Sequence, residues 1–205
     1  YRSYCKFKKW ELPFVTSKLA TSKDFYSINK KRKWITNEFS RGRVHLMRSS
    51  HDCIMTSSKT IIKDNPGLTC RINGLENRSP SRIILDNKLK IQIKSKIIKE
   101  STNYRTIIFY NKINKKKIKL LKKLRIKIYK IPLDNEGNLD LKKSLIKAKK
   151  LGFSRIFLET GLNLTTNFLN KNLVDNFQLF ISDKNLGKSG NNSFRKSMKL
   201  FLKNK

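Results

Sequence analysis

The sequence predicts one α/β domain with a mainly parallel central sheet flanked by helices. Short apolar runs, which include 83–85, 107–110 and 155–158, are typical of buried strands. Segments with helical periodicity alternate with these runs, and this alternation is typical of parallel β-α-β units. The chain has 205 residues, which is enough for one domain with a hydrophobic core and short for two.

The first predicted strand covers 12–20, and the polar stretch 24–33 after it is expected to form a loop. Thr36 can cap a helix that runs to Ser49, because Glu38 then lies in its first turn. The inward-facing positions of this helix would be Phe39, Val44 and Met47.

The middle of the chain is expected to add three strands, at 52–56, 81–86 and 104–110. A short helix at 57–62 follows the first of these strands. The Asp-Asn-Pro-Gly sequence at 64–67 is a strong turn signal, so the chain is expected to reverse there.

The lysine-rich segment 115–124 has the pattern of an amphipathic helix whose lysines form a solvated face. Its inward positions would be Ile118, Leu121 and Leu124. A strand is expected at 126–131. The next helix, at 139–151, should end at Gly152, because glycine is the usual residue just past a helix end.

The last predicted elements are a strand at 155–158, a helix at 161–169 and a strand at 176–182. From residue 185 the sequence is rich in Gly, Asn and Lys, and this stretch is expected to be mobile. A last strand, if the fold has one, is expected beyond the end of the chain.

The net charge of +34 suggests a nucleic-acid-binding protein. Lysines, however, occur in almost every segment, whereas a binding surface would concentrate them on one element with interleaved aromatic residues. The distribution favours a general enrichment in lysine, so no nucleic-acid partner is expected. A non-catalytic basic domain that binds nucleic acid is kept as an alternative.

The three cysteines are Cys5, Cys53 and Cys70, and no CxxC motif occurs. This pattern predicts neither a disulfide framework nor a zinc site, so no metal is expected and a reducing compartment is the default. His45 lies in the middle of a predicted helix without ligand-spaced partners, and we expect it to be structural. No apolar run approaches the ~18 residues that span a bilayer, so no membrane partner is expected.

Three stretches lie at the carboxyl ends of predicted strands, where open α/β sheets bind ligands. In 56–64, hydroxyl residues follow a strand and could contact phosphate or ribose. In 159–166, a glycine turn opens a helix whose N-terminus could bind a diphosphate. In 64–71, Arg71 could bind a phosphate together with Arg48. Taken singly, each stretch could also be an ordinary helix start, a tight turn or a surface cation.

In their order and spacing, these stretches resemble the reductase domain of the bifunctional riboflavin-biosynthesis deaminase/reductase. The resemblance spans roughly 12–187, which is most of the chain. The matching pieces are Lys18-Leu19-Ala20-Thr21-Ser22-Lys23-Asp24, Trp34-Ile35-Thr36, Arg48, 56–71, 78–86, Glu159-Thr160-Gly161 and Leu173-Val174-Asp175.

The resemblance implies a dihydrofolate-reductase-like fold and NADPH as the hydride donor. The implied substrate is 5-amino-6-(5-phosphoribosylamino)uracil, whose ribosyl chain is reduced to ribityl by hydride transfer to C1′ of the opened imine. Such a reaction mainly needs two aligned molecules, so a missing catalytic triad is no objection. Another NADPH reductase of the same fold is the remaining alternative.

The resemblance also assigns residues to roles. Cofactor contacts fall to Thr21, Trp34, Thr60, Asp64, Asn87, Gly161, Leu162, Asn163, Leu164, Thr165, Thr166 and Asn167. Substrate contacts fall to Arg48, Leu68, Arg71 and Glu159, with the arginines near the phosphate. Asp24 and Glu159 are expected to assist proton movement.

The chain departs from the family's pattern at three positions. Phe25 follows Asp24 where the family has Gly, and Arg32 stands where it often has a Ser that contacts the substrate. Thr160 is bulkier than the usual Gly or Ala of the glutamate turn. The segment 25–33 therefore departs most from the pattern.

The resemblance implies three segments and a partner domain. Residues 1–11 would be a connector from an upstream deaminase domain that has been removed, 12–187 the reductase domain, and 188–205 a basic, mobile C-terminal segment. The deaminase's zinc-binding sequence does not occur in this chain. A cytoplasmic homodimer, joined through the sheet edge, is also implied.

Overall fold

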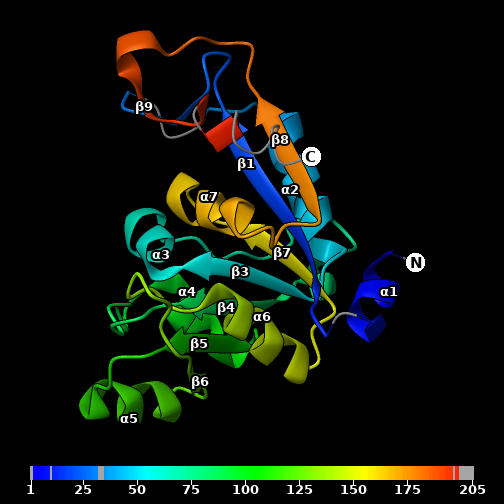
Figure 1. Cartoon of the computed structure of the whole chain (residues 1–205). Helices are drawn as coiled ribbons and strands as arrows, with labels where there is room; N and C mark the ends of the chain where they lie inside the picture. Colours follow the sequence, from blue (N-terminus) through cyan, green and yellow to red (C-terminus); the bar gives the residue numbers. More distant parts are fainter. Residues whose placement is uncertain (1, 10, 32–34, 196, 199–205) are drawn as a thin grey trace.

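The computed structural model describes residues 2–9, 11–31, 35–195 and 197–198. Its main feature is a seven-stranded sheet of order β6-β5-β4-β3-β7-β1-β8, in which neighbouring strands are parallel (Figure 1). The strands are β1 (Phe14–Thr21), β3 (Cys53–Ser57), β4 (Ser81–Leu85), β5 (Thr106–Tyr110), β6 (Lys127–Lys130), β7 (Arg155–Glu159) and β8 (Asn176–Ile181). The seven predicted strands and the mainly parallel sheet are confirmed.

Helices cover both faces of this sheet. One face carries α6 (Leu141–Lys150) and α7 (Leu162–Asn170). The other face carries α2 (Glu38–Ser49), α3 (Ser58–Asp64), α4 (Lys96–Lys99) and α5 (Lys115–Lys123). The five predicted helices are confirmed, and α1 (Arg2–Lys9) and α4 are additions. None of the helices in the described ranges is long and apolar enough to cross a membrane.

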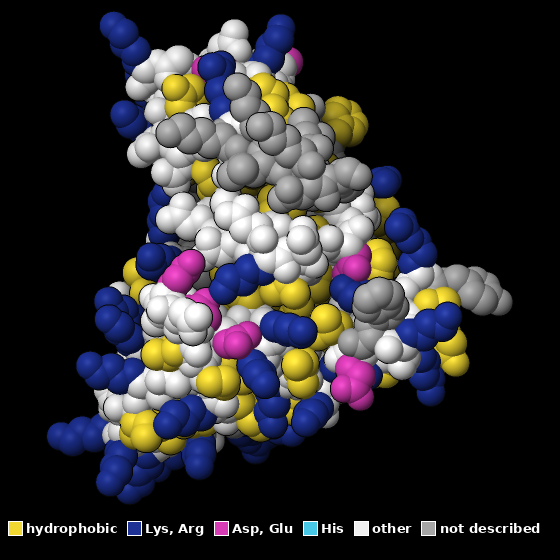
Figure 2. Space-filling model, viewed as in Figure 1, with side chains coloured by type: hydrophobic (Ala, Val, Ile, Leu, Met, Phe, Trp, Pro, Cys, Tyr) yellow, Lys and Arg dark blue, Asp and Glu magenta, His cyan; other side chains and the backbone are white. Residues whose placement is uncertain are grey.

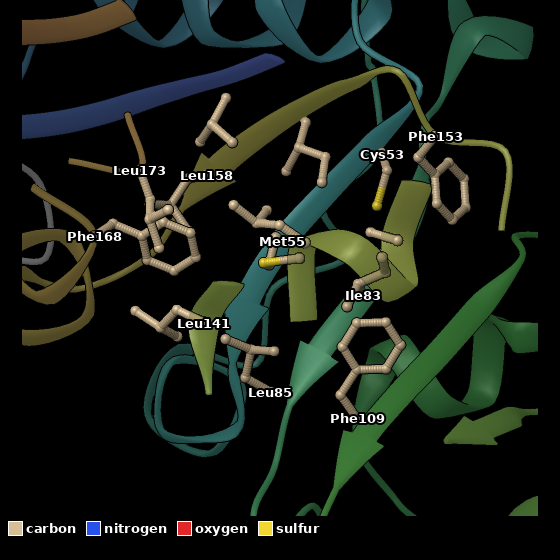
Figure 3. Packing of buried hydrophobic residues seen from close by; sticks show 14 of the residues in the cluster. Cys53, Met55, Ile83, Leu85, Phe109, Leu141, Phe153, Leu158, Phe168 and Leu173 are labelled. Carbon is tan, nitrogen blue, oxygen red and sulfur yellow. The ribbon is translucent and has the colours of Figure 1, made fainter. Parts of the chain in front are cut away.

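The pleat of the strands divides the core into two clusters, because successive side chains point to opposite faces. In β3, Met55 points towards α6 and α7, whereas Ile54 points towards α2 and α3. Figure 3 shows the first cluster, in which Met55 and Leu158 lie with Phe168. Apolar side chains therefore bury both faces of the sheet, and only the ends of its strands can present polar groups to a ligand.

Three details of the predicted helices are wrong. The cap of α2 is Asn37 rather than Thr36, because the Asn37 side-chain oxygen accepts a hydrogen bond from the backbone N–H three residues later. Phe39 is 89% exposed, because it lies five residues before the buried Val44 and so about 140° around the helix. Leu124 is 37% exposed because it lies just past the end of α5.

A second, two-stranded sheet contradicts two expectations. The predicted loop 24–33 contains β2 (Tyr26–Asn29), which pairs antiparallel with β9 (Gly190–Ser193). A last strand, if present, is expected beyond the end of the chain, yet β9 lies within the C-terminal stretch. β2 alternates apolar and polar residues but is only four residues long, and β9 contains no apolar side chain, so neither gives a clear strand signal in the sequence.

The C-terminal stretch is anchored by its apolar side chains. Phe194 is fully buried and packs with Leu19 and Leu169, and its ring lies 5.6 Å from that of Phe177. Gly190 is required where β9 crosses β2, because a Cβ there would lie 2.3 Å from side-chain atoms of Tyr26. The packed fold thus continues past residue 187.

Candidate functional site

The sheet has a switch point between β3 and β7. These strands are neighbours, but the helix after β3 lies on one face of the sheet and the helix after β7 lies on the other. Such a divergence opens a crevice at the carboxyl ends of the strands, where α/β proteins bind ligands. Ser57 and Glu159 are the last residues of β3 and β7 and mark this position.

Glu159 forms a two-pronged ion pair with Arg48 of α2. Arg48 Nε donates to Oε2 at 2.9 Å and Nη2 donates to Oε1 at 2.6 Å. Both side chains are largely buried, with 10% of Arg48 and 19% of Glu159 exposed. Burial alone would raise the pKa of Glu159, but the Arg48 guanidinium and the Lys18 ammonium outweigh it, and the pKa is lowered. Glu159 is therefore a carboxylate at neutral pH.

Lys18 is a second cation beside this carboxylate. It lies opposite Glu159 in the pairing of β1 with β7. Burial lowers the pKa of Lys18, the charge of Glu159 raises it and that of Arg48 lowers it, with a net lowering. No role was predicted for Lys18, although a charged residue inside a mostly buried strand is a signal that could have indicated one.

Three hydroxyl groups meet where β3 and β7 end. The hydroxyl of Thr60 lies 3.0 Å from that of Ser57 and 3.2 Å from that of Thr160. Thr60, a predicted cofactor residue, is thus placed beside Thr160 of the glutamate turn. Hydroxyl groups both donate and accept hydrogen bonds, so the cluster can contact phosphate or ribose oxygens.

The N-terminus of α7 adjoins this cluster. Its N-cap is Gly161, which supplies no side-chain hydrogen bond to the first turn. The first N–H groups of a helix lack partners within the helix and carry a partial positive charge, which suits an anion. The hydroxyl of Thr165 in this helix is buried without a hydrogen-bond partner among the described residues, as is that of Thr21 at the end of β1.

The other predicted cofactor residues of the α7 turn differ in burial, because some point into the core and others towards solvent. Leu162 is buried, Leu164 packs against the core, and the Thr166 hydroxyl lies 3.1 Å from that of Ser197. Asn163 is exposed and Asn167 is partly buried. The contribution of Leu162 and Leu164 to a ligand would therefore come from their backbone.

The loop after α3 is held in an unusual conformation. Asn65 and Leu68 adopt the left-handed region, with φ of 42° and 56°, which is uncommon for residues other than glycine. The buried Arg82 of β4 holds the loop by donating a hydrogen bond from Nη1 to the carbonyl of Gly67 at 3.0 Å. This strained backbone holds Leu68, a predicted substrate residue, in place.

The two arginines expected near the phosphate differ in their surroundings. Arg48 uses its remaining nitrogen to donate to the Thr69 carbonyl at 2.9 Å, so its guanidinium is engaged on three sides. Arg71 is exposed, and its Nη2 lies 3.1 Å from Nε2 of His45. Arg71 is therefore the arginine that is better placed to receive an anion.

Asp24 has a different setting from Glu159. It accepts hydrogen bonds from the Ser22 hydroxyl at 2.6 Å and from the N–H groups of Leu186 at 3.0 Å and Gly187 at 2.8 Å. These contacts, with the Ser22 bond foremost, lower its pKa to about 2. Asp24 thus joins the turn after β1 to the loop after β8.

The remaining predicted cofactor residues are scattered. Asn87 follows β4 and donates to the carbonyl of Gly137 at 3.1 Å, while Asp64 is exposed at the end of α3. Trp34 and the divergent Arg32 lie outside the described residues. Phe25, where the family has Gly, has a φ of 64° and packs in the Phe194 cluster, so it keeps the glycine-like backbone.

A cavity of about 590 Å³ lies near the carboxyl end of β8. Its walls come from the end of β2, the start of α2 and the loop after β8. The residues that line it are Asn29, Ile35, Thr36, Asn37, Ser40, Ile181, Ser182, Asp183, Lys184 and Leu186. Among the described residues, no three His, Cys, Asp or Glu side chains gather as a metal site would require.

Comparison with known proteins gives a consistent result. The model of the RibD C-terminal domain matches residues 13–203. The chain is 32% identical over 180 residues to the riboflavin biosynthesis protein RibD of Aquifex aeolicus, a match that covers 86% of this chain and 48% of that protein. The chain spans about half the length of the curated relatives it matches.

The fold of this chain is similar to that of several solved structures. A Thermotoga maritima diaminohydroxyphosphoribosylaminopyrimidine deaminase/5-amino-6-(5-phosphoribosylamino)uracil reductase has a TM-score of 0.74 and 26% identity, over 95% of this chain and 51% of that one. The Saccharomyces cerevisiae riboflavin biosynthesis reductase Rib7 has a TM-score of 0.71 and 24% identity, over 89% and 78%. The fold implied by the resemblance is confirmed.

Proposed function

Because the chain belongs to the RibD C-terminal domain family, we propose that it is the NADPH-dependent reductase that converts 5-amino-6-(5-phosphoribosylamino)uracil to its ribityl form in riboflavin biosynthesis. The observation that carries this proposal is the group formed by Glu159, Arg48 and Lys18 at the switch point of the sheet. The name of the Thermotoga maritima relative includes the same reductase activity.

The residues near α7 fit a dinucleotide. The N-terminus of this helix has no side-chain cap and suits the diphosphate. The buried hydroxyl of Thr21 has no hydrogen-bond partner among the described residues, and a bound ligand could supply one. The hydroxyls of Ser57, Thr60 and Thr160 suit ribose or phosphate oxygens. NADPH, when bound there, supplies the hydride.

The other side of the crevice suits the substrate. Arg71 would bind the phosphate, because its guanidinium is exposed and can offer two parallel N–H groups to a phosphate. Leu68 would contribute through its fixed backbone, and Glu159 would lie near the reacting end. Arg48 would act mainly by holding Glu159.

The chemistry needs a negative charge and a proton near C1′. Opening of the ribosylamine gives a cationic imine at C1′, and reduction leaves the added proton on the former ring oxygen. The ionised Glu159 can stabilise that cation. Lys18, whose pKa is lowered, is a better proton donor than an ordinary lysine and is assigned to the ring oxygen.

Assembly and location complete the proposal. A homodimer through the sheet edge is supported by Ile181, which is 53% exposed on the edge strand β8. An upstream deaminase domain in the same protein is supported by the twofold greater length of the relatives. A cytoplasmic location agrees with the free thiols of the three cysteines.

One assay tests the proposed activity. The purified chain should oxidise NADPH when given the phosphoribosylaminouracil, with ribityl product detected by mass spectrometry, and NADPH should raise its Tm. A folded sample that does not bind NADPH would contradict the proposal. NADPH binding without turnover of this substrate would instead favour another reductase of the same fold.

A further inference from the structure

His45 lies on α2 between the two arginines of the site. Its Nδ1 is 3.1 Å from the carbonyl oxygen of Thr69 and 3.1 Å from the backbone nitrogen of Arg71. Its Nε2 is 3.1 Å from Nη2 of Arg71, and Nη1 of Arg48 is 3.5 Å from Nδ1. Both ring nitrogens therefore contact Thr69 or Arg71, on the side of the crevice that is assigned to the substrate.

No neutral form of His45 satisfies all these neighbours. A guanidinium only donates, so the contact with Arg71 requires a lone pair on Nε2 and places the proton on Nδ1. Nδ1 then donates to Thr69, and the backbone N–H of Arg71 loses its acceptor. In the other tautomer Nδ1 accepts that N–H, but the Nε2 proton meets the guanidinium, which is also a donor.

An anion between His45 and Arg71 resolves this conflict. With Nε2 protonated, both side chains become donors that point to the same acceptor. A phosphate monoester provides several oxygens, which can accept from both at once. Arg71 is free to make this contact because it is exposed, whereas Arg48 is engaged by Glu159 and Thr69.

We propose that His45 is a phosphate-binding residue, which holds the Arg71 guanidinium in the free protein and donates from Nε2 to the phosphate of the bound substrate. This inference rests on the proposed function, because that function supplies the phosphate monoester. It differs from the expectation that His45 is structural.

The charges around His45 make phosphate binding depend on its protonation. Burial, Arg48 and Arg71 lower the pKa of His45, and the hydrogen bond to the Thr69 carbonyl and the charge of Glu159 oppose them, with a net lowering. The segment Glu76–Arg78 also packs against α2, but its charged side chains, Glu76 and Arg78, are exposed. A phosphate dianion adds negative charge at Nε2, so its binding should be accompanied by proton uptake.

The chain itself provides a control for measuring this uptake. It contains two histidines, and the second, His51, bonds to the carbonyl of Met47 and stacks on Phe157. NMR titration of both imidazoles, assigned with His51→Gln, should be run with ribose 5-phosphate and with ribose. The phosphate should raise the titration midpoint of His45 and leave that of His51 unchanged.

Two outcomes would overturn the inference. One is a titration midpoint of His45 that stays the same when the protein is saturated with ribose 5-phosphate. The other is a failure of ribose 5-phosphate to bind better than ribose.

Kinetics provide a second measurement. In His45→Gln, the KM for the phosphorylated substrate should rise about tenfold and vary less with pH, while kcat and the KM for NADPH stay near wild type. His51→Gln is the matched control and should keep the wild-type KM. An unchanged substrate KM in His45→Gln would contradict the inference.

The two proposals can fail separately. A wild-type chain that binds ribose 5-phosphate with a shifted His45 but turns over no substrate would count against the proposed function. A chain that turns over the substrate while His45 is unaffected by phosphate would count against the present inference alone.

Discussion

The charged residues of this site lie in a largely apolar interior, where Arg48 and Glu159 form an ion pair. Arg48 and Glu159 are 111 residues apart in the chain, and their ion pair follows from the strand order. The motif pieces that contain them could be predicted from the sequence. Their pairing, and the place of Lys18 beside them, could not, because no local pattern records which strands become neighbours.

Replacing the carboxylate of Glu159 should affect both turnover and stability. We expect Glu159→Gln to lower kcat about a hundredfold, because the charge that stabilises the cationic imine is lost. It should also lower the free energy of unfolding by about 3 kcal/mol, since Arg48 is left as an unpaired, largely buried cation. Steady-state kinetics and urea unfolding measure the two effects. Glu136→Gln, in an exposed loop, is the control, and an equally large loss there would refute the assignment.

Asp24 should stabilise the fold in a way that depends on pH. Its pKa is lowered from 3.8 to about 2, so its contribution is present above pH 3.8 and is lost as the pH falls towards 2. Asp24→Asn should therefore have a lower Tm than wild type at neutral pH, and the difference should shrink in acid. Thermal unfolding over this pH range provides the measurement. Asp183→Asn, which removes an exposed carboxylate from the loop after β8, is the control, and a constant difference for Asp24→Asn would contradict this reading.

At the scale of elements, apolar content decided which parts could be predicted. The central strands β3, β4 and β5 are mostly apolar runs between two helical layers, so their positions follow from composition. β2 and β9 are only four residues long and lie far apart in the chain, and no signal in either sequence identifies the other as its partner. The start of α2 was misplaced by one residue, because Thr36 and Asn37 are both good caps.

The segment that carries β9 should contribute to stability. Phe194→Ala should lower the free energy of unfolding by about 3 kcal/mol, because its ring is fully buried in the cluster with Leu19 and Leu169. Phe39→Ala removes the same ring from an exposed position and should change little. Urea unfolding compares them, and equal stabilities would show that the C-terminal segment is not part of the cooperative fold.

The loop after α3 depends on Arg82 of β4. Arg82 donates to the carbonyls of Gly67, Ile97 and Glu100, so Arg82→Met should leave buried acceptors unpaired and cost about 3 kcal/mol. The KM for the substrate should also rise at temperatures where the variant is folded, because Leu68 loses its support. Arg105→Met, at an exposed position just before β5, is the control. A substrate KM that stays at the wild-type value would show that substrate binding does not depend on the support that Arg82 gives the loop.

At the scale of the whole molecule, the basic side chains are dispersed. Figure 2 shows Lys and Arg around the outline of one face and across its lower half, with uncharged and apolar surface between many of them. The charge of +34 should attract DNA at low salt, but because lysines occur in almost every segment rather than on one element, this binding should disappear near physiological salt. Fluorescence anisotropy with random duplex DNA measures it. Tight binding that persists at physiological salt, or loss of NADPH turnover in its presence, would favour the nucleic-acid alternative.

The position of β1 between β7 and β8 has a consequence for synthesis of the protein. This first strand of the sheet pairs with segments 155–159 and 176–181, which leave the ribosome more than a hundred residues after it. The nascent chain must therefore carry β1 with the N–H and C=O groups of its edges unpaired until β7 and β8 have been synthesised. Long-range pairing of this kind is slow. We therefore expect chaperones to matter for the yield of this protein in the cell, more than they would for a fold closed by local contacts.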